Sequence, residues 1–263
     1  MPFKTLQIKT RSKGVTEIIM SRPEVFNAFD ETMIEEMQEA FLQANQDTSL
    51  RAIILSGSGK HFSAGADLQW MQRASSASEE WNLQDARKFA TMLQIIEQSH
   101  LPTIAKIQGA ALGGGVGLVL ACDIAIASDD ANFSISEAKF GILPSVIGPY
   151  LINGVGKRQA KRLALTTSKI SAIDALAINL VHQVCAKDDL DAEIDLAVRD
   201  LLRSGPQAII EIKALFSQLS IGPITPEVIE LTAKTISRVR STAEAKEGFD
   251  AFMNKRHAKW IPE

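Results

Sequence analysis

Three consecutive glycines, Gly113 to Gly115, separate a short apolar segment from a second one that leads to Cys122 and Asp123. This order predicts a strand, a tight glycine loop and the first turn of a helix. Glycine lets the backbone adopt positive φ and lets another molecule approach the main chain closely. The first turn of a helix presents unpaired N–H groups and a partial positive charge. We therefore expect this loop to hold an anion.

Glu137 follows in the segment SISEAKFG, between short apolar stretches. Burial of a carboxylate disfavours its charged form and raises its pKa, which suits the group for proton transfer near neutral pH. An anion-binding loop and a carboxylate of this kind together predict an active site.

A second glycine-containing loop, FSAGAD (62–67), follows the predicted strand 51–57 in the way that the Gly113 loop follows the predicted strand 101–109. The strand-helix-strand order implies a parallel sheet. If the two strands are neighbours, their loops emerge at one edge, and one backbone N–H from each could point at the same oxygen as an oxyanion hole. Either loop alone is equally well explained as a tight turn, but their joint occurrence favours a site.

The rest of the first half predicts an α/β domain. Residues 3–8 and 15–20 alternate polar and apolar side chains and predict a β-hairpin. Apolar residues at helical spacing follow Asp30, the predicted N-cap. A second helix is predicted over 83–99, after a polar stretch, 73–81, that we expect to be a mobile loop. Further short strands are predicted at 123–128, 131–136 and 182–186.

The second half is predominantly helical. Helical periodicity is present in residues 157–165, 171–179 and 189–203. Pro206 and Pro226 each stand where a proline can begin a helix. A charged amphipathic helix is predicted over 243–260. The recurring strand-helix unit is compatible with a spiral of ββα turns over residues 1–203, followed by a helical domain over residues 204–263.

Composition excludes several classes of function. The 263 residues are 46% hydrophobic, enough for a large core, and the net charge of −3 gives no basic surface for a nucleic-acid partner. No apolar stretch approaches the ~20 residues of a membrane span. The first residues alternate in polarity and do not form the apolar core of a signal peptide, so we expect no membrane partner and a cytoplasmic protein.

Metal and nucleotide sites are also not expected. Cys122 and Cys185 both lie in apolar segments, which predicts buried free thiols, and the four histidines lack metal-ligand spacing. The segment SGSGK lacks the upstream glycine of a P-loop, and GGGVG lacks the spacing of a dinucleotide-binding loop. We therefore expect no metal and no separately bound cofactor.

Several spaced segments resemble one known family over nearly the whole chain. HFSAGADLQWM, IQGAALGGGVGLVLACDIAIAS and ANFSISEAKFGILP, with the early SRPEVFNAF and the late EGFDAFMNKRHAKW, resemble the enoyl-CoA hydratase/isomerase (crotonase) superfamily. The resemblance implies a spiral of ββα units with a C-terminal helical oligomerisation domain. It also implies acyl-CoA thioester substrates, of which coenzyme A is a part, and assembly as a homotrimer or a dimer of trimers.

The resemblance assigns roles to individual residues. Ala66 and Gly114 match the two residues whose N–H groups bind the thioester oxygen, and Glu137 matches a catalytic glutamate. The residues that resemble the family's substrate-binding surface are Phe26, Ala28, Ala66, Asp67, Leu68 and Gly114.

One departure concerns the reaction type. Hydratases with two catalytic glutamates have the second in the helix after the glycines, where this chain has Gly117. The segments most resemble methylglutaconyl-CoA or carboxygeranoyl-CoA hydratases, from leucine and acyclic-terpene breakdown, so hydration of a branched or carboxylated 2-enoyl-CoA is the first choice. A Δ3,Δ2-enoyl-CoA isomerase needs only Glu137 and is the first alternative. A catalytically weak acyl-CoA-binding paralogue is the second, of another class.

Four further residues near these motifs have two readings each. Tyr150 is either a proton donor in place of the missing glutamate or an ordinary packed side chain. Trp70 and Trp81 either line an acyl pocket or anchor a loop. Lys139, two residues after Glu137, either recognises a substrate carboxylate or is solvated.

The C-terminal helices carry two further expectations. Their apolar residues exceed what one core edge can cover, which predicts a subunit interface with closed symmetry. Three cations, Lys255, Arg256 and Lys259, either meet the CoA phosphates of a neighbouring subunit or form a solvent-exposed face.

Overall fold

Two sheets organise the chain, whose computed structural model describes residues 2–12 and 14–261. The larger sheet has the order β1-β2-β3-β4-β6-β9, with β1 antiparallel to β2 and all later neighbours parallel. Its strands are β1 (Leu6–Ser12), β2 (Val15–Met20), β3 (Ala52–Gly57), β4 (Thr103–Ile107), β6 (Ile124–Ser128) and β9 (Gln183–Cys185). The smaller sheet comprises β5 (Ala110–Leu112), β7 (Asn132–Ser134) and β8 (Ile170–Ser171), in the order β5-β7-β8.

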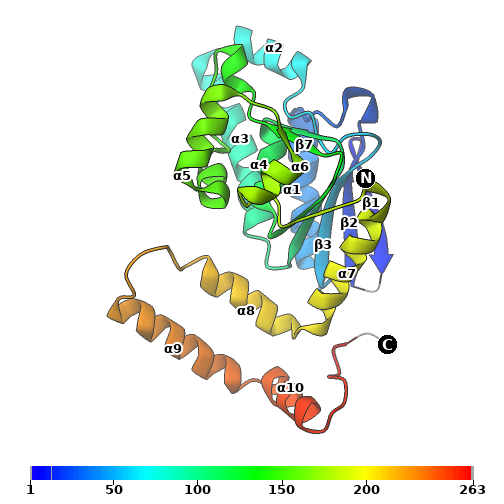
Figure 1. Cartoon of the computed structure of the whole chain (residues 1–263), viewed down its shortest axis with the longest axis vertical. Helices are drawn as coiled ribbons and strands as arrows, with labels where there is room; N and C mark the ends of the chain where they lie inside the picture. Colours follow the sequence, from blue (N-terminus) through cyan, green and yellow to red (C-terminus); the bar gives the residue numbers. More distant parts are fainter. Residues whose placement is uncertain (1, 13, 262–263) are drawn as a thin grey trace.

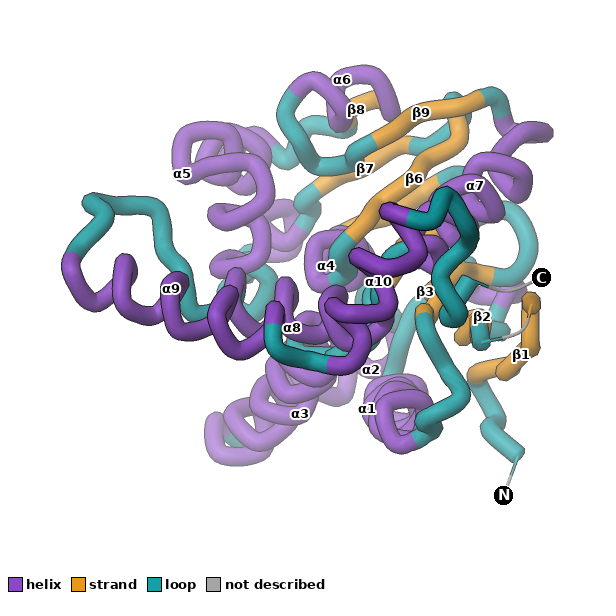
Figure 2. The backbone as a smooth tube through the Cα atoms, turned by 90° about the horizontal axis from the view of Figure 1, so that it is seen from below, coloured by secondary structure: helices purple, strands orange, loops and turns teal. Residues whose placement is uncertain are grey.

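The chain repeats one unit as it passes through these sheets. A strand of the larger sheet leads to a short segment in the second layer and then to a helix, as in β4-β5-α4 and β6-β7-α5. The second of these units can be followed in Figure 2, where β6, β7 and α5 are labelled. Isolated parallel bridges from Ser63 to Ala111 and from Phe29 to Ala66 continue the second layer. The predicted α/β class and the ββα spiral are confirmed. The helices are α1 (Glu31–Gln46), α2 (Leu68–Ser76), α3 (Glu79–Glu97), α4 (Gly114–Ala121), α5 (Gly148–Thr166) and α6 (Ala172–Ala177).

The central parallel strands β3 and β4 are buried on both faces, as is usual for parallel strands. Ile53 and Leu55 of β3 belong to the main core, while Ile54 belongs to a second cluster with Ile194 of α7 (Leu190–Arg203). Successive side chains of a strand point to opposite faces, so β3 contributes side chains to both cores. The amphipathic helix predicted over 189–203 is α7, and it covers the second face.

Capping side chains decide where several helices begin. The predicted hairpin is formed by β1 and β2, and Asp30 caps α1 by accepting the Met33 N–H at 3.0 Å. The expected loop over 73–81 is wrong, because most of it is helical. Ser78 accepts the Trp81 N–H at 3.2 Å and begins α3, and two glutamates in the first turn favour that helix start.

Three C-terminal helices lie apart from the sheets (Figure 1). They are α8 (Pro206–Phe216), α9 (Pro226–Arg240) and α10 (Ala243–Met253), and both prolines begin their helices as predicted. The last helix ends at Met253 and not at residue 260, because Lys255 adopts a φ of 52°. Of the described residues in these helices, only Ala251 is buried. The domain boundary at residue 203 stays a prediction.

Candidate active site

The two glycine-containing loops touch each other. β3 and β4 are parallel neighbours, as the oxyanion hypothesis requires. Gly65 has a φ of 85°, and a Cβ there would lie 2.5 Å from the Leu112 carbonyl oxygen and 3.4 Å from the Gly114 nitrogen. Only glycine tolerates this φ together with so close an approach. The strand order therefore brings the segments around residues 65 and 114 into direct contact.

The bridge to Phe29 sets the direction of the Ala66 amide. The Phe29 N–H donates to the Gly65 carbonyl at 2.8 Å, and the Asp67 N–H donates to the Phe29 carbonyl at 3.0 Å. In a parallel bridge of this kind, the residue between the two bonded positions turns its own N–H and C=O away from the partner strand. The Ala66 N–H is therefore directed away from Phe29, and Ala66 lines a cavity.

Gly114 contributes the second amide to the same cavity. It is the first residue of α4, so its N–H has no carbonyl one turn earlier in that helix. A Cβ on Gly114 would lie only 2.4 Å from Cζ of Phe29, so a side chain does not fit there. The preceding Gly113 turns the chain with a φ of 50°.

Glu137 faces this loop from the opposite segment. It begins the 3-10 helix η2 (Glu137–Phe140), and its Oε1 lies 3.1 Å from the position that a Cβ on Gly113 would occupy. Burial raises the pKa of the Glu137 carboxyl, against the effect of its own backbone N–H and that of Ser136. Oε2 is buried and accepts no hydrogen bond from the described residues. The carboxylate is thus a free proton acceptor beside the glycine loop.

A cavity of about 470 Å³ joins these groups. Ala66, Gly114 and Glu137 line it, together with Trp70 of α2 and Asp85 of α3. Sequence reasoning missed Asp85, because it lies on a charged helix face whose partner could not be read from local spacing. Trp70 is confirmed as a cavity residue.

Only some of the residues proposed for the CoA-binding surface line the cavity. Leu68 is 75% exposed and lines the cavity. Phe26 is half-exposed and packs edge-on against the His61 ring, with centroids 5.0 Å apart, whereas Ala28 is buried. Neither Phe26 nor Ala28 lines the cavity. Their role in binding substrate stays a prediction.

The Asp67 carboxylate positions the loop. Its Oδ1 caps α2 by accepting the N–H groups of Gln69 at 2.8 Å and Trp70 at 3.3 Å. Burial alone would raise the pKa of Asp67, but these N–H groups and the guanidinium of Arg22 hold it below its usual value. The charged carboxylate is therefore committed to the start of α2, next to Ala66.

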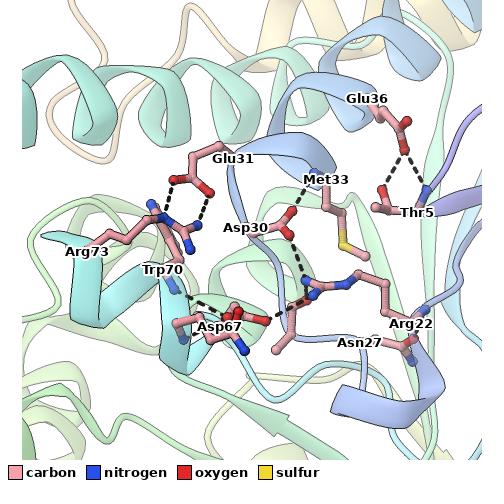
Figure 3. A network of polar contacts seen from close by, with 12 residues as sticks. Thr5, Arg22, Asn27, Asp30, Glu31, Met33, Glu36, Asp67, Trp70 and Arg73 are labelled. Atoms are coloured by element: carbon pink, nitrogen blue, oxygen red, sulfur yellow. Dashed lines mark hydrogen bonds and ion pairs between the residues drawn. The ribbon is translucent and has the colours of Figure 1, made fainter.

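Arg22 connects the starts of α1 and α2 through Asp30 and Asp67, as Figure 3 shows. It donates to the Ala28 carbonyl at 2.7 Å and to Asp67 Oδ2 at 3.0 Å, and it pairs with Asp30 Oδ2 at 3.2 Å. Asp30 and Asp67 are the N-caps of α1 and α2. Sequence reasoning missed this role of Arg22, although it predicted Asp30 as an N-cap and placed Asp67 at the end of the loop 62–67.

The space beside Gly117, where two-glutamate hydratases carry their second glutamate, is filled by other side chains. A Cβ on Gly117 would lie 2.4 Å from Cγ2 of Ile147 and 3.4 Å from Cδ1 of Leu93. Gly117 does not line the cavity, and side chains of the core fill the space beside it. No carboxylate can therefore be supplied from this position without repacking Ile147.

Of the residues with two readings, only some reach the cavity. Lys139 is exposed and lines it. Trp81 does not line it, and Tyr150 lines a separate cavity with Cys122 and Asp123, which does not support Tyr150 as a proton donor to the site. Cys122 and Cys185 are free as expected, but only Cys122 is fully buried.

Two of the three cations after α10, Arg256 and Lys259, pair with carboxylates of α10. Arg256 pairs with Glu247 at 2.6 Å and also with Asp250, and Lys259 lies 3.7 Å from Glu247. Hydrogen bonds from Arg256 lower the pKa of Glu247 to about 2. Contact of these cations with CoA phosphates stays a prediction.

No metal cluster and no membrane-spanning helix is found in the described part of the chain. Within residues 2–12 and 14–261, no group of three or more His, Cys, Asp or Glu side chains could hold a metal ion. Over the same residues, no helix has the length and apolar character needed to cross a bilayer.

Comparison with known proteins gives one consistent result. The sequence model of the family described as enoyl-CoA hydratase/isomerase matches residues 10–262. The chain is 31% identical over 267 residues to a crotonyl-CoA hydratase of Syntrophomonas wolfei, covering 99% of each chain. It is 35% identical over 234 residues to a peroxisomal Delta(3,5)-Delta(2,4)-dienoyl-CoA isomerase of Arabidopsis thaliana, covering 81% of each. The crystal structure of an enoyl-CoA hydratase from Shewanella pealeana superimposes with a TM-score of 0.94 at 37% identity, covering 98% of this chain and 96% of that one.

Proposed function

Because this chain belongs to the enoyl-CoA hydratase/isomerase family, we propose that it adds water across the 2,3 double bond of a branched or carboxylated 2-enoyl-CoA. The observation that carries the proposal is the free Glu137 carboxylate beside the glycine loop, in the cavity that Ala66 and Gly114 also line.

The amides of Ala66 and Gly114 bind the thioester oxygen in this proposal. Attack of water at C3 moves negative charge onto that oxygen and gives an enolate. Two N–H donors fixed by the fold stabilise this charge without reorganising, and each is worth ~3 kcal/mol in comparable sites. The strand order and the Phe29 bridge support this role, because they hold the two amides in place before substrate binds.

Glu137 is the general base in this proposal. It takes a proton from the attacking water while the oxygen forms its bond to C3. The enolate then receives a proton at C2, and we propose that Glu137 returns the proton it has taken. This cycle balances with one carboxylate, which agrees with the closed position at Gly117. A raised pKa suits a group that must both accept and donate the proton.

The acyl chain is the finer part of the proposal. The resemblance to methylglutaconyl-CoA hydratases, enzymes of leucine breakdown, indicates a short branched chain with a terminal carboxylate. Lys139 supports the carboxylated form, because its ammonium group is carried by a residue that lines the cavity two positions after Glu137. An acyl carboxylate paired with this lysine would be oriented relative to the base.

An isomerase is the alternative that one specific observation favours. Shuttling a proton between C2 and C4 requires a single carboxylate, and Gly117 leaves only Glu137 in that part of the site. The similarity to the Arabidopsis thaliana isomerase is compatible with it. A catalytically weak acyl-CoA-binding paralogue has less support, because the base and both glycine loops are retained.

One assay separates these functions. Crotonyl-CoA, 3-methylglutaconyl-CoA and 3-hexenoyl-CoA are each incubated with the purified protein, and products are identified by mass. We expect hydration of the first two, with a higher kcat/KM for 3-methylglutaconyl-CoA. Conversion of 3-hexenoyl-CoA to the 2-enoyl isomer without hydration would establish the isomerase instead. Binding of all three without turnover would establish the paralogue.

We also propose that the protein assembles as a homotrimer or a dimer of trimers through residues 204–263. Large apolar side chains of α8 to α10, such as Phe216, Phe249 and Phe252, are between 63% and 81% exposed in the single chain. Light scattering should give a trimer or hexamer, and deletion from Pro206 onward should give insoluble or inactive protein. A stable, fully active monomer would contradict this assembly. Cytoplasmic localisation stays a prediction of the sequence.

A further inference from the structure

A second carboxylate lines the proposed substrate cavity, and the mechanism does not use it. Asp85 lies on α3, and its Oδ1 accepts the indole N–H of Trp70 at 3.2 Å. Trp70 also lines the cavity and is nearly buried. Burial raises the pKa of Asp85 even though the Trp70 hydrogen bond and the nearby cations Lys88 and Arg73 lower it. Asp85 is half-buried, so its carboxyl group is only partly hydrated.

Two aromatic residues near Asp85 reach towards Gly114. Phe89 follows Asp85 by four residues, about 6 Å along α3, and Cζ of Phe89 lies 3.0 Å from the Cβ position of Gly114. Trp70 packs on Phe29, with ring centroids 5.9 Å apart, and Phe29 in turn contacts the Gly114 position. Asp85 is thus connected to the Gly114 position through Trp70 and Phe29 and, along α3, through Phe89.

Many of the other residues that line the cavity are apolar. They include Met71 and Ala74 of α2 and, from the segment after Glu137, Phe140 and Ile142. A chain held by its thioester oxygen at the glycine loop would extend along these side chains.

We propose that Asp85 ends the acyl-binding part of this cavity and restricts the enzyme to short acyl chains. The inference rests on the proposed function, because it takes the thioester oxygen to lie at Ala66 and Gly114. Burying one methylene contributes about 0.8 kcal/mol, or about a fourfold gain in affinity. A terminal methyl group in contact with Asp85 brings no comparable gain in affinity, because it displaces water from a carboxyl group with which it cannot form a hydrogen bond.

Two substitutions test this role. Asp85→Leu replaces the carboxylate by an apolar group, whereas Asp85→Asn retains an oxygen acceptor for Trp70 and a polar side chain but removes the charge. Glu80→Leu is the matched control, since Glu80 is an exposed glutamate of α3 that does not line the cavity. Affinities for butanoyl-CoA and octanoyl-CoA are measured by calorimetry, and kcat/KM is measured for crotonyl-CoA and 2-octenoyl-CoA.

In the wild type, we expect far less than a fourfold gain in affinity per methylene between butanoyl-CoA and octanoyl-CoA. Asp85→Leu should shift the octanoyl-to-butanoyl affinity ratio at least tenfold toward octanoyl-CoA, Asp85→Asn should shift it by a smaller factor, and Glu80→Leu should leave it unchanged. If the hydrogen bond to Trp70 only joins α2 to α3, Asp85→Leu will weaken both ligands equally, and that result would overturn the proposal.

The affinity ratio also separates this inference from the proposed reaction. Failure of the wild type to hydrate crotonyl-CoA would refute hydration, while the affinity ratios would still report on chain length. If Asp85→Leu does not fold, an unchanged ratio in Asp85→Asn overturns the role of Asp85 by itself.

Discussion

Oε1 of Glu137 lies 3.1 Å from the point where a Cβ on Gly113 would stand, so the carboxylate and the glycine loop form one surface of the cavity. A side chain at residue 113 would separate the base from the loop that begins α4. The absence of a side chain there therefore serves the site as well as the turn, whose φ of 50° already favours glycine.

Replacement of the base should abolish turnover and spare binding. Glu137→Gln keeps the size of the side chain but cannot accept a proton, so kcat should fall by ~10² to 10⁴, the range typical of general-base catalysis. The dissociation constant for butanoyl-CoA should stay within a few fold of the wild type. Hydration of crotonyl-CoA near the wild-type rate would refute Glu137 as the base.

The activity should depend on pH through the raised pKa of Glu137. The base must be ionised to take a proton from water, so kcat should rise with pH through a pKa above the ordinary 4.5 of a glutamate. A rate profile of crotonyl-CoA hydration measures this acid limb. A midpoint at or below 4.5 would contradict the burial of the carboxylate.

The same raised pKa should make Glu137 costly to stability at neutral pH. A group whose pKa is higher in the folded state stabilises the fold below its unfolded pKa, and this contribution is lost as pH rises through the folded pKa. Urea midpoints of the wild type and Glu137→Gln are compared at pH 4.5 and pH 8. Relative to the wild type, the urea midpoint of the variant should be higher at pH 8 than at pH 4.5. An equal difference between the two proteins at both pH values would refute the linkage.

The Gly114 amide can be tested with a matched pair of substitutions. Gly114→Ala and Gly114→Pro both add a Cβ, which would lie 2.4 Å from Cζ of Phe29, but only proline removes the N–H. The kcat of the proline variant should be lower than that of the alanine variant by ~10² to 10³, as for loss of one oxyanion donor. Circular dichroism checks that both variants fold. Equal kcat values would place the oxyanion hole elsewhere.

A glutamate introduced at residue 117 should not be accommodated by the native core. In Gly117→Glu, the new Cβ would meet Cγ2 of Ile147 at 2.4 Å, and overpacking of this kind typically costs about 1–3 kcal/mol. The free energy of unfolding from urea titration should fall by that amount. Ile147→Ala removes the clashing Cγ2, so the double variant Gly117→Glu/Ile147→Ala should lose less free energy of unfolding than the two single variants lose together. A larger loss in the double variant than in the two single variants together would contradict the steric explanation.

Loss of the Arg22 guanidinium should reduce both stability and kcat. Arg22→Met leaves the carboxylates of Asp30 and Asp67 without their partner, and we expect the free energy of unfolding to fall by about 2 kcal/mol, less than for a fully buried pair. The kcat should fall more than the affinity for butanoyl-CoA, because the Ala66 loop loses its support. Arg73→Met is the control, since Arg73 pairs with Glu31 at the exposed surface and its loss should leave the urea midpoint almost unchanged. Similar effects of both substitutions would refute the positioning role.

The sequence by itself determined the parts of the fold that depend on neighbours along the chain. Alternating polarity predicted β1 and β2, apolar residues at helical spacing after Asp30 predicted α1, and glycines after strands predicted the two loops. These features are local, because backbone preference, capping and periodicity act over a few residues. The candidate base Glu137 was found in the same way, from a carboxylate between apolar segments.

Two helix boundaries were predicted wrongly, and local backbone features explain both. The stretch 73–81 is polar enough to suggest a loop, but Ser78 caps α3 within it, and the cap decides the helix start. The charged end of the chain continues the helical pattern beyond Met253, yet Lys255 takes a positive φ and ends α10.

Only the tertiary structure decided which distant residues meet. Arg22 joins Asp30 and Asp67, Trp70 joins Asp85, and Ile147 fills the space beside Gly117. Each contact links segments whose relative position depends on how the ββα turns stack, and no local pattern encodes that stacking. For this reason the candidate base and the glycine loops could be predicted from the sequence, whereas the lining of the cavity, its second carboxylate and the filled space beside residue 117 could not.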